Sequence, residues 1–392
     1  MKTVGTISIG VKAPIIKRGD DLVKIVTSSV LQAEQELALP LLDNDIVAVT
    51  EAVVARSQNN YATIDQIASD IASKTNGGVV GLLNPILSRN RFSLILKAIS
   101  KACQKVIIQL TYPCDEVGNP LFANSQEVLV NSNVNPYFDS FTYEQFVDTF
   151  GKPCHPFTKV DYLEYYKSIC PNCEIILSNR SDNLLKYTNT IIVAEIHSRQ
   201  HTKKRLQSLG AKVICLDEIL TSSVDGSGFN SQFGLLGSNL ATQTSIKLFP
   251  NNAQLFVDQL ASSLKTATNK NIQVMVYGDG AFKDPVGGIW ELADPVTSPA
   301  YTSNLCGNPN ELKLKYLADT TLKDYSGQEA VERMQDIIKN KSKENDAFNT
   351  QGTTPRRYID LLASLADLTS GSGDKGTPII LIKNYFNNYA DK

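Results

Sequence analysis

Three consecutive segments between residues 190 and 216 constrain the fold of this chain more than any other part of it. Residues 190–196 are an apolar run typical of a buried strand, residues 197–209 are typical of a helix, and residues 213–216 are apolar again. A strand, a helix and a second strand in this order form a βαβ unit, whose strands are parallel and whose crossover is right-handed. No Gly-x-Gly-x-x-Gly motif opens the helix, which argues against a dinucleotide site of the Rossmann type. Further strand-like runs occur at 46–50, 106–110, 174–177 and 379–382. We therefore predict an α/β fold with mixed sheets.

Length and charge narrow the class of protein. A chain of 392 residues is long enough for two domains with a substantial core. Its 38 basic and 40 acidic residues give a formal net charge of -2. The chain lacks the excess of basic residues that would indicate binding to nucleic acid or to an anionic membrane surface. The N-terminus has no apolar signal-like core, and no run approaches the roughly 18 apolar residues that span a bilayer. We predict a cytoplasmic protein.

The seven cysteines favour reduced thiols over a disulfide framework. Cys170 and Cys173 form one CxxC motif, and Cys154 and His155 lie nearby in the sequence. A zinc site is conceivable here, although structural zinc sites usually show two such pairs. A redox protein that uses this CxxC motif and the βαβ unit is a further hypothesis.

The apolar run at 272–276 ends in a turn that carries charged side chains. Asp279 lies between two glycines, and Lys283 and Asp284 follow within the same stretch. Glycines let the backbone approach a ligand closely, and carboxylate oxygens are ligands of hard divalent cations. The competing interpretation is an ordinary turn between two strands.

A second strand-like run, 106–110, also leads into carboxylates. Asp115 and Glu116 follow it, and Asn119 comes shortly after them. Acidic residues at the ends of two strands can share one metal ion. An ordinary turn is again the alternative.

Several short motifs, taken in order, resemble the coenzyme F420 gamma-glutamyl ligases. They lie at residues 14–22, 43–58, 113–119, 248–252, 278–284 and 359–371. The resemblance covers roughly residues 10–121 and 240–385. It implies a catalytic domain formed by residues 1–122 with 229–392, and leaves 123–228 as an inserted α/β subdomain that contains the βαβ unit.

The resemblance implies an amide ligase that depends on GTP, or another nucleoside triphosphate, and on Mg²⁺ or Mn²⁺. Members of the family phosphorylate a carboxylate, and the amine of L-glutamate then attacks the acyl phosphate. The expected acceptor is a coenzyme F420 precursor or a folate-type carboxylate, and the expected assembly is a homodimer. Carried over by motif, the metal ligands are Asp115 and Asp279, with Glu116 and Asp284 as further candidates.

Cations are needed where two anions meet, because they neutralise phosphate charge and align the reacting groups. We expect Lys283 and Arg89 to clamp phosphate or carboxylate, with Arg91 as an alternative.

The expected nucleotide contacts are Asp20, Arg56 and Asn119, which lie in or near the similar motifs. The chain departs from the family at Ala52, where the family has a lysine, at Gln58, where it has a glutamate, and at Gly280, where it has a threonine. These departures motivate a second hypothesis, a non-catalytic nucleotide- or metabolite-binding protein that retains the ligase fold.

Overall fold

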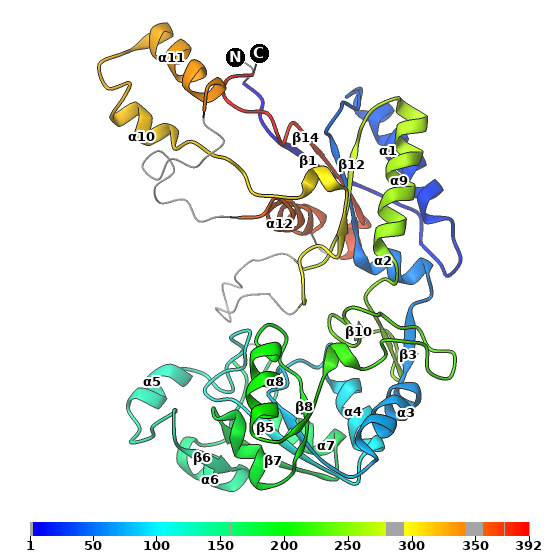
Figure 1. Ribbon diagram of the computed structural model, residues 1–392, viewed down its shortest axis with the longest axis vertical. Helices are drawn as coiled ribbons and strands as arrows, with labels where there is room; N and C mark the ends of the chain where they lie inside the picture. Colours follow the sequence, from blue (N-terminus) through cyan, green and yellow to red (C-terminus); the bar gives the residue numbers. More distant parts are fainter. Residues whose placement is uncertain (1–2, 157, 280–293, 342–355, 372, 392) are drawn as a thin grey trace.

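The computed structural model describes residues 3–156, 158–279, 294–341, 356–371 and 373–391, and these residues form two lobes (Figure 1). Both chain ends lie in the first lobe, and the second lobe is formed by one continuous central stretch of the chain. The predicted α/β class is confirmed. No helix in the described ranges is both long and apolar enough to cross a bilayer.

The described residues of the first lobe build a five-stranded sheet with the order β1-β14-β2-β12-β13. The strands are β1 (Ile7–Val11), β14 (Ile379–Lys383), β2 (Ile46–Thr50), β12 (Gln273–Tyr277) and β13 (Ala300–Tyr301). Only β2 and β12 pair in parallel among these described strands, so their carboxyl ends meet at one edge of the sheet. In an α/β sheet this is the edge outside which ligands bind.

Both faces of this sheet are covered by helices. Val47 and Val49 of β2 point to the face that packs on α1 (Leu22–Leu37) and α9 (Ala253–Thr268). Ile46 and Ala48 point to the other face, which packs on α12 (Tyr358–Ser370). Because β2 is buried on both faces, its sequence is a continuous apolar run rather than an alternating one. The short helix α2 (Glu51–Ser57) follows β2, and α10 (Leu314–Asp319) and α11 (Gly327–Lys339) form a helical hairpin beyond the sheet (Figure 1).

The second lobe contains a sheet whose described strands have the order β6-β7-β5-β4-β8-β9. They are β6 (Ser140–Thr142), β7 (Cys173–Ser178), β5 (Lys105–Leu110), β4 (Val79–Leu83), β8 (Thr190–Val193) and β9 (Lys212–Cys215). All pairings are parallel except that of β6 with β7. The predicted βαβ unit is confirmed as β8, α8 (Arg199–Ser208) and β9.

The remaining elements of the second lobe complete its layers. The core on one face of the sheet includes residues of α3 (Ile64–Thr75), α4 (Ser93–Ala102) and α7 (Tyr162–Ile169), while Leu206 of α8 packs on the other. Two short helices, α5 (Ser125–Val130) and α6 (Tyr143–Phe150), lie near β6 (Figure 1). A small sheet of β10 (Asn239–Leu240), β11 (Ser245–Lys247) and β3 (Tyr61–Thr63) lies where this lobe meets the first.

The predicted segment 123–228 does not form a sheet by itself. β4 and β5 precede it in the sequence, yet they are the central strands of the sheet that also contains β7, β8 and β9. The second lobe therefore begins near residue 61 and ends near residue 249, instead of at the predicted boundaries of 123 and 228.

The chain crosses between the lobes at two adjacent places, after α2 and before α9. The buried side chain of Asn60 ties them together: its amide donates hydrogen bonds to the backbone carbonyls of Phe229, at 3.0 Å, and of Phe249. Its Oδ1 accepts the N–H of Phe229 at 2.9 Å. Gly228 packs against this amide so closely that a Cβ there would lie 2.4 Å from Asn60 Oδ1. One side chain thus fixes both crossings.

Candidate functional site

A pocket of about 380 Å³ opens at the edge of the first sheet where β2 and β12 end. Glu51 directly follows β2, and Gly278 and Asp279 directly follow β12. All three residues line the pocket, together with Arg56, Asp367 and the glycine-rich turn at 370–377. This pocket therefore gathers charged side chains at the edge where a ligand is expected.

Arg91 joins the second lobe to this edge. It lies in the loop between β4 and α4, and its guanidinium forms ion pairs with Asp279 and, at 2.6 Å, with Asp294. Asp294 is only 4% exposed, whereas Asp279 is 39% exposed. The second oxygen of Asp294 accepts the backbone N–H of Asp279 at 2.8 Å. Asp294 and Arg91 together hold Asp279 against the pocket wall.

This arrangement explains the glycine before Asp279. A Cβ at Gly278 would lie 2.6 Å from Oδ2 of Asp294, so the carboxylate can approach only because no side chain is present. Burial and the neighbouring Asp294 raise the pKa of Asp279 to about 7, and Arg91 opposes that rise. Asp279 therefore changes charge near neutral pH.

A second cation reaches the same edge from the second lobe. Lys247 ends β11, and its Nζ lies 2.5 and 2.6 Å from the two carboxylate oxygens of the buried Glu51. Burial raises the pKa of Glu51, and Lys247 opposes the rise. The second lobe therefore supplies two positive charges, Arg91 and Lys247, to carboxylates at this edge of the first-lobe sheet.

Residues of the glycine-rich turn at 370–377 also line this pocket. Gly371 and Gly376 have φ values of +64° and +67°, a left-handed conformation that glycine adopts without strain. Arg56, which the sequence predicts to contact the nucleotide, is exposed on α2 and lines the same pocket. Backbone without side chains beside an arginine is suited to a phosphate group.

Asp115 lies elsewhere and is fully engaged. Its carboxylate accepts the backbone N–H groups of Leu87, Val117 and Asn119 and the side-chain amide of Asn119, at 2.8–3.1 Å. It is 8% exposed, and burial raises its pKa to about 6 despite these hydrogen bonds. A metal ion here would have to replace these donors, and Asn119, predicted to contact the nucleotide, is itself part of the arrangement.

Glu116 is engaged in the second lobe as well. It accepts the backbone N–H groups of Ile196, His197 and Ser198 and the hydroxyl of Ser198, at 2.6–2.9 Å. These groups precede α8, so Glu116 connects the loop after β5 to the start of that helix. In the described ranges, neither Asp115 nor Glu116 belongs to a group of three potential metal ligands with Asp279.

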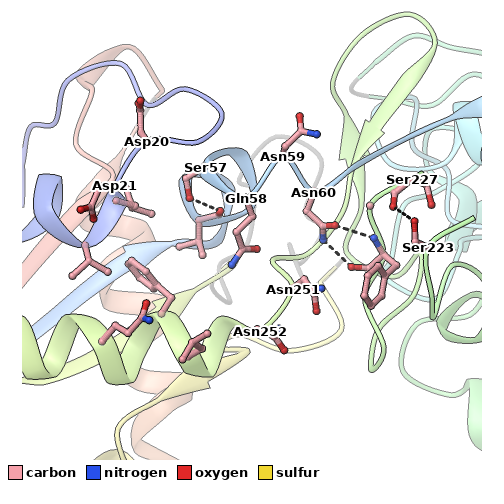
Figure 2. A pocket seen from close by; sticks show the side chains of 18 of the residues that line it. Asp20, Asp21, Ser57, Gln58, Asn59, Asn60, Ser223, Ser227, Asn251 and Asn252 are labelled. Atoms are coloured by element: carbon pink, nitrogen blue, oxygen red, sulfur yellow. Dashed lines mark hydrogen bonds between the residues drawn. The ribbon is translucent and has the colours of Figure 1, made fainter. Parts of the chain in front are cut away.

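Asp20 lines a different cavity, of about 570 Å³, between the lobes (Figure 2). Its carboxylate accepts the backbone N–H of Lys17 at 2.6 Å and closes the loop before α1. Neutral polar side chains also line this cavity: Ser57, Gln58, Asn59, Asn251 and Asn252. Asp20 and Arg56, which the sequence predicts to bind one nucleotide, are thus on different cavities.

Three further predicted site residues remain, namely Arg89, Lys283 and Asp284. Arg89 is exposed, and it is Arg91, two positions later, that contacts the carboxylates. Lys283 and Asp284 lie outside the described residues.

Sequence reasoning missed Glu51, Lys247 and Asp294. The position of Glu51 could have been used to predict it as a site residue, since it directly follows an apolar strand, much as Asp279 does. Nothing similar points to Lys247 and Asp294, because their roles depend on contacts between distant segments.

Among the residues that the structure describes, Cys170 and Cys173 do not belong to a group of three potential metal ligands. The group of three potential metal ligands found among the described residues is Cys215, Asp217 and Glu218. Arg199 and Lys203 already pair with its two carboxylates, and burial raises the pKa of Cys215 to about 12. A protonated thiol beside two cations is a poor metal site.

Comparison with known proteins and families places the chain in one family. No curated protein shows a significant match to the chain. The model of the family described as F420-0:Gamma-glutamyl ligase matches residues 10–384, which include both lobes. This match spans nearly the whole chain, and the chain belongs to the F420-0:gamma-glutamyl ligase family.

Proposed function

We propose that this chain is a nucleotide- and divalent-metal-dependent ligase that adds L-glutamate to a carboxylate acceptor through an acyl phosphate. The family supports a glutamate ligase role. The observation that carries the finer proposal is the cluster of Glu51, Asp279 and Asp294 with Arg91 and Lys247 at the carboxyl ends of two parallel strands. We propose GTP as the nucleotide and a coenzyme F420 precursor or a folate-type molecule as the acceptor.

Among the described residues, Asp279 belongs to no group of three potential metal ligands, so Mg²⁺ or Mn²⁺ at this edge would be held by Asp279 together with substrate and water oxygens. Carboxylate oxygens are the ligands these hard cations prefer, and Asp279 is exposed to the pocket. Asp279 would hold the metal. Asp294 would orient Asp279 through the hydrogen bond that it accepts from the backbone N–H of Asp279. When bound, the metal supplies charge neutralisation for the transferred phosphoryl group.

The remaining side chains have roles that follow from their charges. Arg56 and the glycine-rich turn would hold phosphate on one side of the pocket. Arg91 and Lys247 pair with Asp279 and Glu51, which line the pocket, and a carboxylate substrate would exchange with Asp279 or Glu51 as their partner. Since both cations belong to the second lobe, substrate binding would be coupled to the contact between the lobes. We propose a homodimer as the assembly.

Thermal unfolding in the presence of ligands tests the nucleotide and metal requirement. A ligand that binds only the native state raises the midpoint of unfolding. We expect GTP with Mn²⁺ to raise it, and Asp279→Ala to abolish the shift. Asp258→Ala, an exposed carboxylate on α9, is the matched control and should keep the shift.

Turnover separates this proposal from a binding protein that lacks catalysis. With GTP, Mn²⁺, L-glutamate and an acceptor, the ligase releases GDP and phosphate only when both substrates are present. Binding of GTP without product, over a panel of carboxylate acceptors, would favour the non-catalytic alternative that Ala52 and Gln58 suggest.

A further inference from the structure

The turn that joins α7 to β7 in the second lobe begins at Cys170 and ends at Cys173. The N–H of Cys173 donates to the carbonyl of Cys170 at 3.1 Å and closes it as a β-turn. Pro171, at the second position, has the fixed φ angle that such a turn favours. The end Cα atoms of a β-turn lie within about 7 Å, and those of a disulfide lie about 4.4–6.8 Å apart. The backbone therefore holds these two free thiols at a separation that suits a disulfide.

Asn172 anchors this turn to the C-terminal end of α4. Its side-chain amide donates hydrogen bonds to the backbone carbonyls of Ser100, at 3.0 Å, and of Cys103, at 2.8 Å. Its Oδ1 accepts the hydroxyl of Ser100 at 2.6 Å and the thiol of Cys170 at 3.4 Å. Arg91 precedes the opposite end of the same helix, so the thiols lie apart from the charged pocket.

The two thiols differ in access and in acidity. Cys170 is 0% exposed, whereas Cys173 is partly exposed and Pro171 beside them is exposed. The thiols hydrogen-bond to each other, which raises the pKa of Cys170 and lowers the pKa of Cys173. Lys167 assists the lowering at Cys173, while burial and Glu174 oppose it. Because the thiolate is the nucleophile, the accessible Cys173 is the sulfur that reacts with a reagent from solvent.

We propose that Cys170 and Cys173 form a thiol–disulfide exchange site, which reduces a low-molecular-weight disulfide and is itself converted to a disulfide. The accessible thiol, the neighbouring buried thiol and the anchored turn supply what such an exchange requires. This site is additional to the ligase chemistry and does not depend on the proposed function.

The exchange has two steps. The thiolate of Cys173 attacks one sulfur of the small disulfide, whose S–S bond breaks and releases one thiolate. The sulfur of Cys170 then attacks the mixed disulfide at Cys173 and displaces the second small thiolate, which takes the proton that Cys170 loses. Two electrons pass from the protein to the small disulfide, and the Cys170–Cys173 disulfide is the oxidised product.

Oxidised glutathione is the probe, and the full-length reduced protein is incubated with it, alkylated and mapped by peptide mass spectrometry. We expect the Cys170–Cys173 disulfide in at least about ten times as many molecules as carry glutathione at Cys173, because the second thiol displaces it. Dithiothreitol should restore both thiols. Cys170→Ala should retain glutathione at Cys173, since no second thiol displaces it, and Cys173→Ala should leave the buried Cys170 unmodified. Cys170→Ser gives the same readout as Cys170→Ala should the alanine variant unfold.

The matched control is Cys306→Ala, which removes an exposed thiol from the first lobe and should leave the Cys170–Cys173 disulfide unchanged. The assignment is overturned if Cys170 and Cys173 both remain alkylated thiols, or if Cys170 pairs instead with the buried Cys103. It is equally overturned if the folded Cys170 variants carry glutathione at Cys306 but not at Cys173. The thermal shift with GTP and Mn²⁺, measured on the same samples, tests the proposed function alone and should be the same in Cys170→Ala and Cys306→Ala.

Discussion

Asp115 and Asp279 follow strands in the same way, yet the chain uses them differently. Asp115 is 8% exposed and accepts four N–H hydrogen bonds from its own lobe. Asp279 is 39% exposed, lines a pocket, and is held by Arg91 from the other lobe. The first carboxylate therefore organises a loop, and the second remains accessible to a ligand.

The difference lies in what surrounds each carboxylate. Three backbone N–H groups and the side-chain amide of Asn119 saturate Asp115, and one of the backbone groups, that of Leu87, comes from the loop after β4. Asp279 instead faces side chains from distant segments, which can exchange partners with a substrate. Asp279 thus differs from Asp115 both in its exposure and in the origin of its partners.

The largest effect is expected from removing Asp115. Asp115→Ala leaves four donors without a partner in a buried loop, and we expect a loss of about 3–5 kcal/mol in the free energy of unfolding. Urea denaturation measures this loss. Should Asp115→Ala remain stable but lose Mn²⁺ binding, Asp115 would be a metal ligand and the contrast with Asp279 would disappear.

Removing Arg91 should have the next largest effect. Arg91→Met leaves the buried Asp294 without a counter-ion, and we expect a loss of about 2–4 kcal/mol in the free energy of unfolding. Arg89→Met, two residues away and exposed, is the matched control and should change it by less than about 0.5 kcal/mol. Equal effects of the two substitutions would show that the ion pairs with Asp279 and Asp294 do not stabilise the chain.

Neutralising Asp279 should change binding more than stability. We expect Asp279→Asn to weaken binding of GTP with Mn²⁺ on the order of 10–100-fold, because a ligand to the metal is lost. Isothermal titration calorimetry measures this change. Asp115→Asn, if folded, should bind as the unaltered protein does, and the opposite ranking of the two variants would reverse the comparison.

The smallest effect concerns pH. The pKa of Asp279 is raised to about 7, so the carboxylate is protonated below that pH and ionised above it. A metal binds only the ionised form, and we expect the affinity for Mn²⁺ to fall about threefold between pH 7.5 and pH 6.5. Asp279→Asn should remove this dependence, and a fall of the same size in that variant would assign it to another group.

The sequence was sufficient for the parts of the fold that depend on local pattern. The βαβ unit around α8 and the strand β12 before Asp279 were predicted, because each is encoded by apolar runs within a few tens of residues. The pairing of β2 with β12 was not predicted, since it joins segments more than 200 residues apart and no local pattern encodes it. The roles of Glu51 and Arg91 depend on that pairing.

The boundary of the second lobe was missed for a related reason. β4 and β5 lie in the part of the chain that resembles the family by its motifs, so they were assigned to the first domain. The sheet shows instead that they are its central strands, and central strands cannot be separated from the neighbours that hydrogen-bond to them.

The hydrogen bonds of Asn60 have a consequence for how such a chain can be assembled. For the first lobe, the whole second lobe is a loop whose two ends already touch, since Asn60 joins one crossing to Phe229 and Phe249 beside the other. The entropy lost in closing a loop grows only slowly with its length, so the size of this insert hardly affects the first lobe. A lobe inserted at two adjacent crossings of this kind can be lengthened, exchanged or lost during evolution while β2 and β12 keep their register. It brings Arg91 and Lys247 with it, and the cations at the sheet edge are then exchanged as a pair.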